Sequence, residues 1–402
     1  MMLENDRRSV VRRSPLPPSQ SRPLATPLMP SSVYVADDLY AIDAQYEGRA
    51  PGFTYAREGH PNAIILAQKI DWLEGLAAAE DHGGGVITSS GMSAITAVFL
   101  GALEAGDHVV GSNQLYGRTL RQLTQELPKF GITATLVDPT DADAVAAAMR
   151  PETKMIMMEV IANPTIVVAD MPAIAKIAAD HGALLAVDNT FTTPLAYRPF
   201  ERGADIVIHS VTKLLAGHSD VTLGYAVARE PGLNRAIYDA MATFGLNGSP
   251  YDCWLAERGM HSFALRYERA AANAMALARH VAALDGVEQV LYPGLESDPG
   301  HALAKQLFGS NFGNMLSIKL KGGWAAANAF VRAVPELPFA PTLGDVATTT
   351  SHPPTSSHRA VSRTDREAIG ITDGFIRVSV GIEDIDLLCR EFAMAVAQAH
   401  KS

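Results

Sequence analysis

The sequence predicts an α/β protein with a mostly parallel sheet. Short apolar runs of strand character alternate with stretches of helical periodicity through the middle of the chain. Polar residues follow several of these runs directly, as expected where buried strands reach the carboxyl edge of a sheet. From about Tyr251 onward, longer helical stretches and a few separate strands predict a second, smaller α+β domain.

The length of 402 residues allows more than one domain, and we expect three parts. Residues 1–62 form an N-terminal arm, flexible to about residue 22. Residues 26–59 then carry too little apolar periodicity to fold alone, so they are expected to pack elsewhere, for example against another subunit. Residues 63–260 form the α/β domain, and residues 261–402 form the smaller α+β domain.

The individual elements follow from apolar periodicity. Strands are expected at 108–110, 134–137, 155–160, 184–187, 206–208, 223–227, 314–320 and 375–380. Helices are expected at 63–76, from about 92 to 103, and at 142–149, 171–179, 254–287 and 385–399. The segment from 340 to 363 is dense in Pro, Thr, Ser and His, and a loop of this length is suspected of function.

Composition excludes several classes of function. A net charge of -10 argues against nucleic acid or an anionic membrane as the main partner, and no apolar run reaches membrane-spanning length. Cys253 and Cys389 provide no disulfide framework and no metal cluster, which favours a reducing cytoplasm. The histidines of the 340–363 segment lack zinc-ligand spacing, so no metal is expected.

The strand at 206–208 ends in the most informative motif of the chain, His209-Ser210-Val211-Thr212-Lys213. It places two hydroxyls and one amine where a buried parallel strand meets the edge at which α/β proteins bind ligands. A solvated lysine at an ordinary strand end is the alternative.

Two charged residues occupy similar positions. Asp188 follows the apolar run Ala183–Val187, and a carboxylate buried there needs a cationic partner, such as the protonated ring nitrogen of a cofactor. A turn or cap aspartate is the alternative. Arg377 lies within the strand at 375–380 and could capture a substrate carboxylate through both guanidinium nitrogens. A solvated arginine on an edge strand is the alternative.

Two further features suit an anion such as phosphate. Ser90-Gly91-Met92 opens an apolar helix, whose free backbone N–H groups and positive dipole end attract anions. The alternative is a purely structural helix cap. Tyr55 and Arg57 place a hydroxyl and a guanidinium two residues apart, although a surface arginine beside a half-buried tyrosine has the same pattern.

Together, these motifs resemble the trans-sulfuration (Cys/Met metabolism) family of pyridoxal-phosphate-dependent enzymes. The resemblance runs from about Thr26 to the C-terminus. Its most specific part runs from Ala186-Val187-Asp188-Asn189-Thr190-Phe191 through the Lys213 motif to Gly217-His218-Ser219-Asp220. The resemblance implies fold type I with a seven-stranded type of sheet, and a homotetramer built as a dimer of dimers.

The resemblance also implies roles for the residues. Lys213 would carry pyridoxal 5'-phosphate and move protons, Asp188 would keep the pyridine nitrogen protonated, and Tyr116 would stack on the ring. The phosphate would be held by Ser90, Gly91, Met92, Ser210 and Thr212, and by Tyr55 and Arg57 from a neighbouring subunit.

The implied substrate is a small L-amino acid with a γ-leaving group. Its α-carboxylate would be held by Arg377, with Asn163 and Thr342 beside it. The implied reaction is elimination through quinonoid and vinylglycine-type intermediates. The alternatives are γ-replacement, as in a sulfhydrylase of O-acyl-homoserine or a cystathionine γ-synthase, and an inactive relative that binds the cofactor.

Departures from the family pattern fall where the substrate side chain would be read. Arg118 stands where methionine γ-lyases typically carry cysteine, and the glutamate of cystathionine enzymes is absent near Ala347. Asp345 and Glu58 could favour a substrate with a cationic tail. Loop charges in water are the alternative for both.

Overall fold

The computed structural model describes residues 19–76, 83–359 and 361–401. Its larger sheet has seven strands in the order β1-β7-β6-β5-β4-β2-β3. Strands β2 to β6 run parallel, whereas β7 is antiparallel to its neighbours β6 and β1. The strands are β1 (Val86–Thr88), β2 (His108–Ser112), β3 (Thr133–Val137), β4 (Thr153–Glu159), β5 (Leu184–Asp188), β6 (Ile206–His209) and β7 (Gly224–Ala228). The predicted α/β class with a mostly parallel sheet is confirmed.

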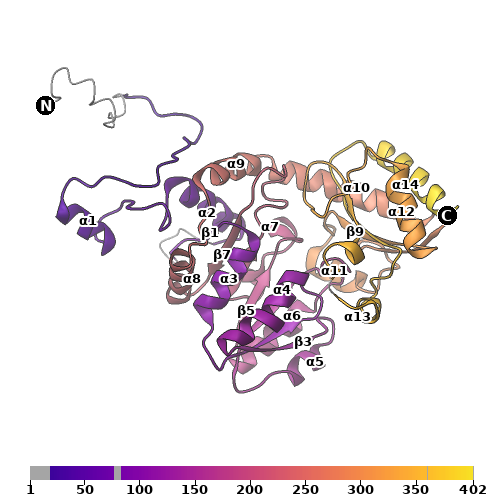
Figure 1. Ribbon diagram of the computed structural model, residues 1–402, viewed down its shortest axis with the longest axis horizontal. Coiled ribbons are helices and arrows are strands. Elements are labelled where there is room, and N and C mark those ends of the chain that lie inside the picture. The colour runs from indigo at the N-terminus through magenta and orange to yellow at the C-terminus, as the bar shows by residue number, and fades with distance from the viewer. Residues whose placement is uncertain (1–18, 77–82, 360, 402) are drawn as a thin grey trace.

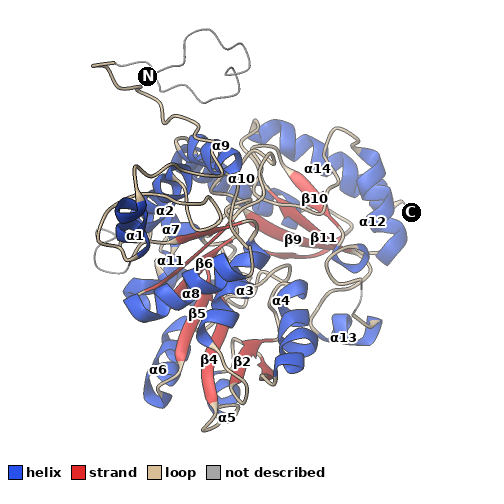
Figure 2. Ribbon diagram, turned by 60° about the vertical axis from the view of Figure 1, so that its left-hand side comes forward, coloured by secondary structure: helices blue, strands red, loops and turns tan. Residues whose placement is uncertain are grey.

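Helices cover both faces of this sheet (Figure 2). They are α2 (Pro61–Leu73), α3 (Gly91–Ala102), α4 (Gly117–Arg121), α5 (Ala142–Ala147), α6 (Met171–His181), α7 (Thr193–Ala196), α8 (Pro231–Thr243) and α9 (Pro250–Met260).

Strand β6 explains why these strands read as continuous apolar runs. Ile206 and Ile208 pack into the cluster that contains Val98 of α3, whereas Val207 packs into the cluster that contains Leu66 of α2. Since successive side chains point to opposite faces, a sheet covered on both sides needs apolar residues at every position.

The C-terminal part has an antiparallel sheet of four strands in the order β10-β11-β9-β8. These are β8 (Val287–Leu291), β9 (Met315–Leu320), β10 (Thr349–Ser351) and β11 (Phe375–Ser379). Its helices are α10 (Phe263–Ala282), α11 (His301–Phe308), α12 (Gly323–Ala333), α13 (Arg363–Ala368) and α14 (Ile385–His400). Phe330 of α12 and Phe392 of α14 contact each other in the core with ring centroids 5.6 Å apart.

The predicted single helical region at 254–287 is wrong. The chain forms α9 to Met260 and α10 from Phe263, and β8 begins at Val287. The break is stabilised by the Arg266 guanidinium, which donates hydrogen bonds to the carbonyls of Gly259 at the end of α9 (3.1 Å) and of Leu214 (2.9 Å). A local signal, Gly259, and the long-range contacts of Arg266 therefore end the helix together.

The other predicted elements are present with boundaries shifted by a few residues. The helices and strands that were not predicted are β1, β8, α1, α4, α7, α8, α11, α12, α13, and β10 within the 340–363 segment. The domain limits at residues 62 and 260 stay predictions.

The N-terminal segment extends away from the rest of the chain (Figure 1). Helix α1 (Leu39–Tyr46) has no buried residue, and an isolated bridge joins Val33 to Tyr55. Large apolar side chains stay exposed here, as expected for a segment that cannot fold alone. The predicted flexible stretch lies mostly outside the described residues. In the described ranges, no helix combines the length and apolar character needed to cross a bilayer.

Candidate active site

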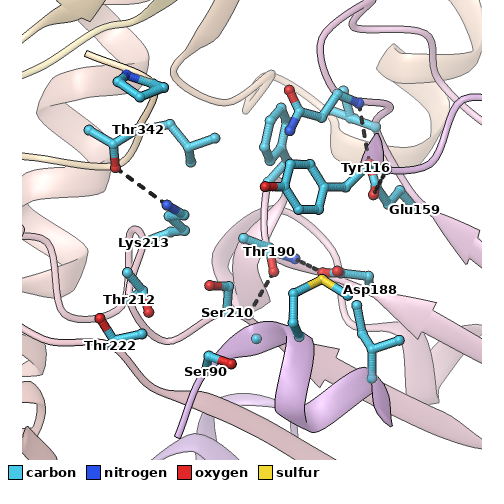
Figure 3. A pocket seen from close by; sticks show the side chains of 18 of the residues that line it. Ser90, Tyr116, Glu159, Asp188, Thr190, Ser210, Thr212, Lys213, Thr222 and Thr342 are labelled. Atoms are coloured by element: carbon cyan, nitrogen blue, oxygen red, sulfur yellow. Dashed lines mark hydrogen bonds between the residues drawn. The ribbon is translucent and has the colours of Figure 1, made fainter. Parts of the chain in front are cut away.

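A cavity of about 230 Å³ lies at the carboxyl ends of β4, β5 and β6 (Figure 3). It is closed on one side by residues of the C-terminal sheet and of the segment before β10. Most of the predicted site residues line it: Ser90, Gly91, Met92, Tyr116, Asn163, Asp188, Ser210, Thr212, Lys213, Thr342 and Arg377. The strand ends converge because parallel strands direct their carboxyl ends to one edge.

Lys213 lies just after β6, on the turn that leaves the sheet edge. Its Nζ donates to Thr342 Oγ1 at 3.3 Å. Burial lowers the pKa of the Lys213 amine, and the positive charge of Arg377 lowers it further. Gly344 permits this packing, since a Cβ there would lie 2.6 Å from the Leu214 nitrogen. The amine is therefore held in the cavity, and the solvated-lysine alternative is wrong.

Asp188 ends β5 at the floor of the cavity. Burial raises the pKa of its carboxyl, while hydrogen bonds from Thr190 and the nearby His209 act in the opposite direction. The Thr190 backbone N–H donates to Oδ1 at 3.0 Å. Within the described part of the chain, Asp188 makes no ion pair with a lysine or arginine. A buried acid in this setting suits a protonated nitrogen supplied by a ligand.

The N-terminus of α3 forms the anion side of the cavity. Ser90 caps the helix, since its Oγ accepts from the Ser93 N–H at 3.1 Å. A Cβ on Gly91 would lie 2.7 Å from the Cβ of Ser210, so a glycine is needed for this close approach. Thr212 Oγ1 donates to the Leu223 carbonyl at 3.1 Å and accepts the Leu223 N–H at 2.9 Å, so its hydroxyl is already engaged by the protein. Ser210 presents its hydroxyl beside Gly91 at the start of α3.

Arg377 lies on β11, which pairs on both sides with β9 and β10. It is 5% exposed, so the edge-strand alternative is wrong. One terminal nitrogen donates to Asn163 Oδ1 at 2.9 Å and the other to the Thr342 carbonyl at 2.7 Å. Nε is buried without a partner, and burial lowers the pKa of the guanidinium to about 10. The group is rigidly oriented and has unused donor capacity.

Four predicted site residues lie outside this cavity. Arg57 donates to the Ala242 carbonyl at 2.7 Å and contacts the Tyr55 ring in a separate depression. Arg118 is exposed on α4, and Asp345 accepts the Ala347 N–H at 2.8 Å. Within one chain these residues do not reach the cavity, and their roles stay predictions.

The sequence analysis gave no site role to several residues that line the cavity, among them Glu159, Thr190, Phe191, Thr222, Ile161 and Leu343. Glu159 was detectable, because it ends β4 as Asp188 ends β5, and the two are register partners. The apolar members carry no such signal. In the ranges that the structure describes, no group of three His, Cys, Asp or Glu could hold a metal ion.

Ser357 and His358, from the predicted functional loop, pack beside the start of α4, next to Tyr116. A Cβ on Gly117 would lie 2.7 Å from the Ser357 carbonyl oxygen, and His358 next to it is 3% exposed. His358 Nδ1 lies 2.9 Å from Ser357 Oγ. The pKa of the imidazole is lowered to about 4, mainly by burial and further by Arg377. The segment is therefore packed against the site.

Replacing His358 with asparagine is expected to reduce sensitivity to acid. Stability that depends on neutral His358 is fully present above its unfolded pKa near 6.5 and is lost as the pH falls to about 4. That difference corresponds to about 3 kcal/mol. Urea unfolding at pH 7.5 and 4.5 should show the wild type losing about 2 to 3 kcal/mol relative to the variant. His181→Asn, on the surface of α6, is the control. An equal loss in wild type and His358→Asn would contradict the assignment.

A cavity between a large, mostly parallel sheet and a small antiparallel one, with a lysine at its centre, defines a pyridoxal-phosphate-dependent enzyme of fold type I. A family model described as "Cys/Met metabolism PLP-dependent enzyme" matches residues 9–397. The chain belongs to this family, and its cofactor is pyridoxal 5'-phosphate.

Known relatives span different activities of the family. The chain is 37% identical to an L-methionine gamma-lyase of Fusobacterium nucleatum, over 90% of this chain and 91% of that one. It is 39% identical to a cystathionine beta-lyase of Bacillus subtilis, over 86% of each. A solved cystathionine gamma synthase from Xanthomonas oryzae pv. oryzae, in complex with aminoacrylate and cysteine, matches with a TM-score of 0.87 and 34% identity, over 94% of each chain.

Proposed function

We propose that this protein is a lyase that removes the γ-substituent of an L-amino acid of homoserine or homocysteine type. One observation carries the proposal: Lys213, with a lowered pKa, lies in the same cavity as the buried Arg377 and its partner Asn163. A base and a carboxylate-binding group thus face one substrate-sized space.

The residues of the cavity fit pyridoxal phosphate. Asp188 would pair with the ring nitrogen, and the N–H groups of Gly91 and Met92 with the Ser210 hydroxyl would hold the phosphate. The Tyr116 ring would stack on the pyridine. When bound, the cofactor withdraws electrons from the substrate carbon and so acidifies its proton.

The protein side chains supply orientation and proton transfer. Arg377 would bind the α-carboxylate through the donor capacity that Asn163 and Thr342 leave free. Its lowered pKa makes Lys213 neutral more often than a solvated lysine, so it can accept a proton from Cα and return one to a later carbon. The Tyr116 hydroxyl would assist departure of the γ-substituent.

Replacement at Cγ is the second candidate, because 94% of the chain matches a solved cystathionine gamma synthase. The two reactions share every residue named above and differ in whether a thiol enters before the product leaves. An inactive relative is disfavoured, since Lys213, Asp188, Tyr116 and Arg377 all line the cavity.

A substrate panel distinguishes these functions. L-methionine, L-cystathionine, L-homoserine and O-acyl-L-homoserines are each incubated with the holoenzyme, with and without sulfide. We expect 2-oxo acid and ammonia in the absence of sulfide. Homocysteine formed from an O-acyl-L-homoserine and sulfide, without 2-oxo acid, would establish replacement instead. If none of these compounds is turned over, the remaining candidate is an inactive relative that binds the cofactor.

We also propose a homotetramer in which Tyr55 and Arg57 reach the cavity of a neighbouring subunit. The exposed N-terminal segment and its two arm residues outside their own cavity support this. A sedimentation mass near the 42.8 kDa of one chain would contradict it.

The free thiols of Cys253 and Cys389 support a reducing, cytoplasmic location, which cell fractionation tests.

A further inference from the structure

Glu159 is a buried acid beside the cavity, with no part in the chemistry proposed above. It ends β4, is 8% exposed and is the register partner of Asp188 on β5. Burial raises its pKa well above the usual range, and the charge of Asp188 raises it further, whereas the backbone hydrogen bonds from Tyr116 and Asn163 favour the carboxylate and oppose this rise. Within the described residues, Glu159 makes no salt bridge with a lysine or arginine. Burying a carboxyl group without a cationic partner costs free energy, so the presence of an acid at this position needs a structural explanation.

Both carboxylate oxygens of Glu159 accept backbone hydrogen bonds from the cavity wall (Figure 3). Oε1 accepts from the Tyr116 N–H at 2.7 Å, and Oε2 accepts from the Asn163 N–H at 3.2 Å. Tyr116 belongs to the loop between β2 and α4, whereas Asn163 belongs to the loop after β4. One side chain therefore joins two loops that form opposite parts of the site.

The Asn163 loop leads on to the substrate end of the cavity. Asn163 Oδ1 accepts a hydrogen bond from Arg377 at 2.9 Å, so the position of its backbone determines where the guanidinium is held. Tyr116 is the ring proposed to stack on the cofactor. The chain of contacts from Tyr116 through Glu159 and Asn163 to Arg377 spans both ends of the site.

We propose that Glu159 is a positioning residue, whose two carboxylate oxygens hold the Tyr116 loop and the Asn163–Arg377 pair in register. This rests on the proposed roles of Tyr116 and Arg377. A carboxylate has two acceptor oxygens, while an amide has one acceptor and one donor. Glutamine could satisfy only one of the two buried N–H groups and would turn its own N–H₂ toward the other. The need for two acceptors accounts for an acid here despite its burial.

Glu159→Gln tests this inference. Its amide oxygen should keep the shorter bond to Tyr116 and leave the Asn163 N–H unpaired, so Arg377 loses its exact placement. Binding of glycine and of methylamine to the holoenzyme is followed through the visible absorbance of the cofactor. Glycine carries a carboxylate for Arg377 to bind, whereas methylamine carries none. We expect about tenfold weaker glycine binding, the effect of one unpaired buried group, with methylamine binding unchanged.

Asp298→Asn is the matched control. Asp298 also accepts two backbone N–H groups, from Gly300 at 2.8 Å and Tyr292 at 3.1 Å, but does not line the cavity. The Asp298→Asn substitution should lower the thermal midpoint of the apoprotein without changing the binding of glycine or of methylamine. Glu159→Asp, too short to reach both loops, replaces Glu159→Gln if that variant does not fold, with the same result expected.

Unchanged glycine binding in a folded Glu159 variant would overturn the inference, as would an equal loss for glycine and methylamine. A wild-type holoenzyme whose absorbance does not respond to glycine would overturn the proposed function, and this inference with it. The two failures are therefore distinguishable. A change confined to the thermal midpoint, matching that of Asp298→Asn, would reduce Glu159 to a structural residue.

Discussion

Replacing Lys213 with alanine is expected to lower kcat/KM by about ten-thousandfold or more, because the amine proposed both to anchor the cofactor and to transfer protons is lost. The amine lies in the cavity beside Thr342, and burial lowers its pKa. Among the residues that the structure describes, no other lysine lines the cavity. Steady-state turnover of the best substrate in the panel measures the loss.

A second readout for Lys213→Ala is chemical. Borohydride reduction of the wild-type holoenzyme should fix the cofactor to the peptide that contains Lys213, and the variant should carry no fixed cofactor. Lys176→Ala, which removes an exposed lysine that pairs with Asp180, should behave as the wild type. Cofactor fixed to Lys213→Ala would show that another lysine holds it.

Replacing Arg377 with lysine is expected to raise KM by at least about 30-fold, with a smaller change in kcat. The planar guanidinium binds Asn163 and Thr342 while keeping donor capacity for the substrate, and a single ammonium cannot keep this geometry. The loss should therefore appear mainly in carboxylate binding. Initial rates across substrate concentrations separate the two parameters.

Arg366→Lys is a suitable comparison for Arg377→Lys. Arg366 is also buried, at 8% exposed, and donates to the Ile371 carbonyl and the Asp373 carboxylate outside the cavity. Its replacement should lower stability and leave KM unchanged. An equal rise of KM in both variants would assign the effect to the fold of the C-terminal sheet.

The core of the site could be predicted because it depends on local pattern. Asp188 and Lys213 each follow a buried apolar strand directly, and parallel strands bring such positions to one edge. The helix that begins after Ser90 was recognisable from its cap and the glycine beside it. Each of these features is marked by residues that lie within a few positions of one another along the chain.

The structural features that the sequence did not predict depend on contacts between residues far apart in the chain. The break between α9 and α10 is held by Arg266 reaching carbonyls near residue 215, while the sequence around the break stays helical in pattern. Arg118 and Asp345 were placed near the substrate by motif position; within one chain they do not line the cavity, and their roles stay predictions. Motif position determines where a backbone runs, and packing determines where a side chain points.

The contact between Asn163 and Arg377 also bears on how the protein matures during synthesis. It joins residues 214 positions apart, and β11 is among the last elements to be made. A nascent chain that has emerged to residue 260 already contains Lys213, Asp188 and the α3 N-terminus, but not Arg377. Since domains fold in order of emergence, the surface for the cofactor forms before that for the substrate carboxylate. Under the proposed roles, binding of the substrate carboxylate is thus acquired in the final stage of translation.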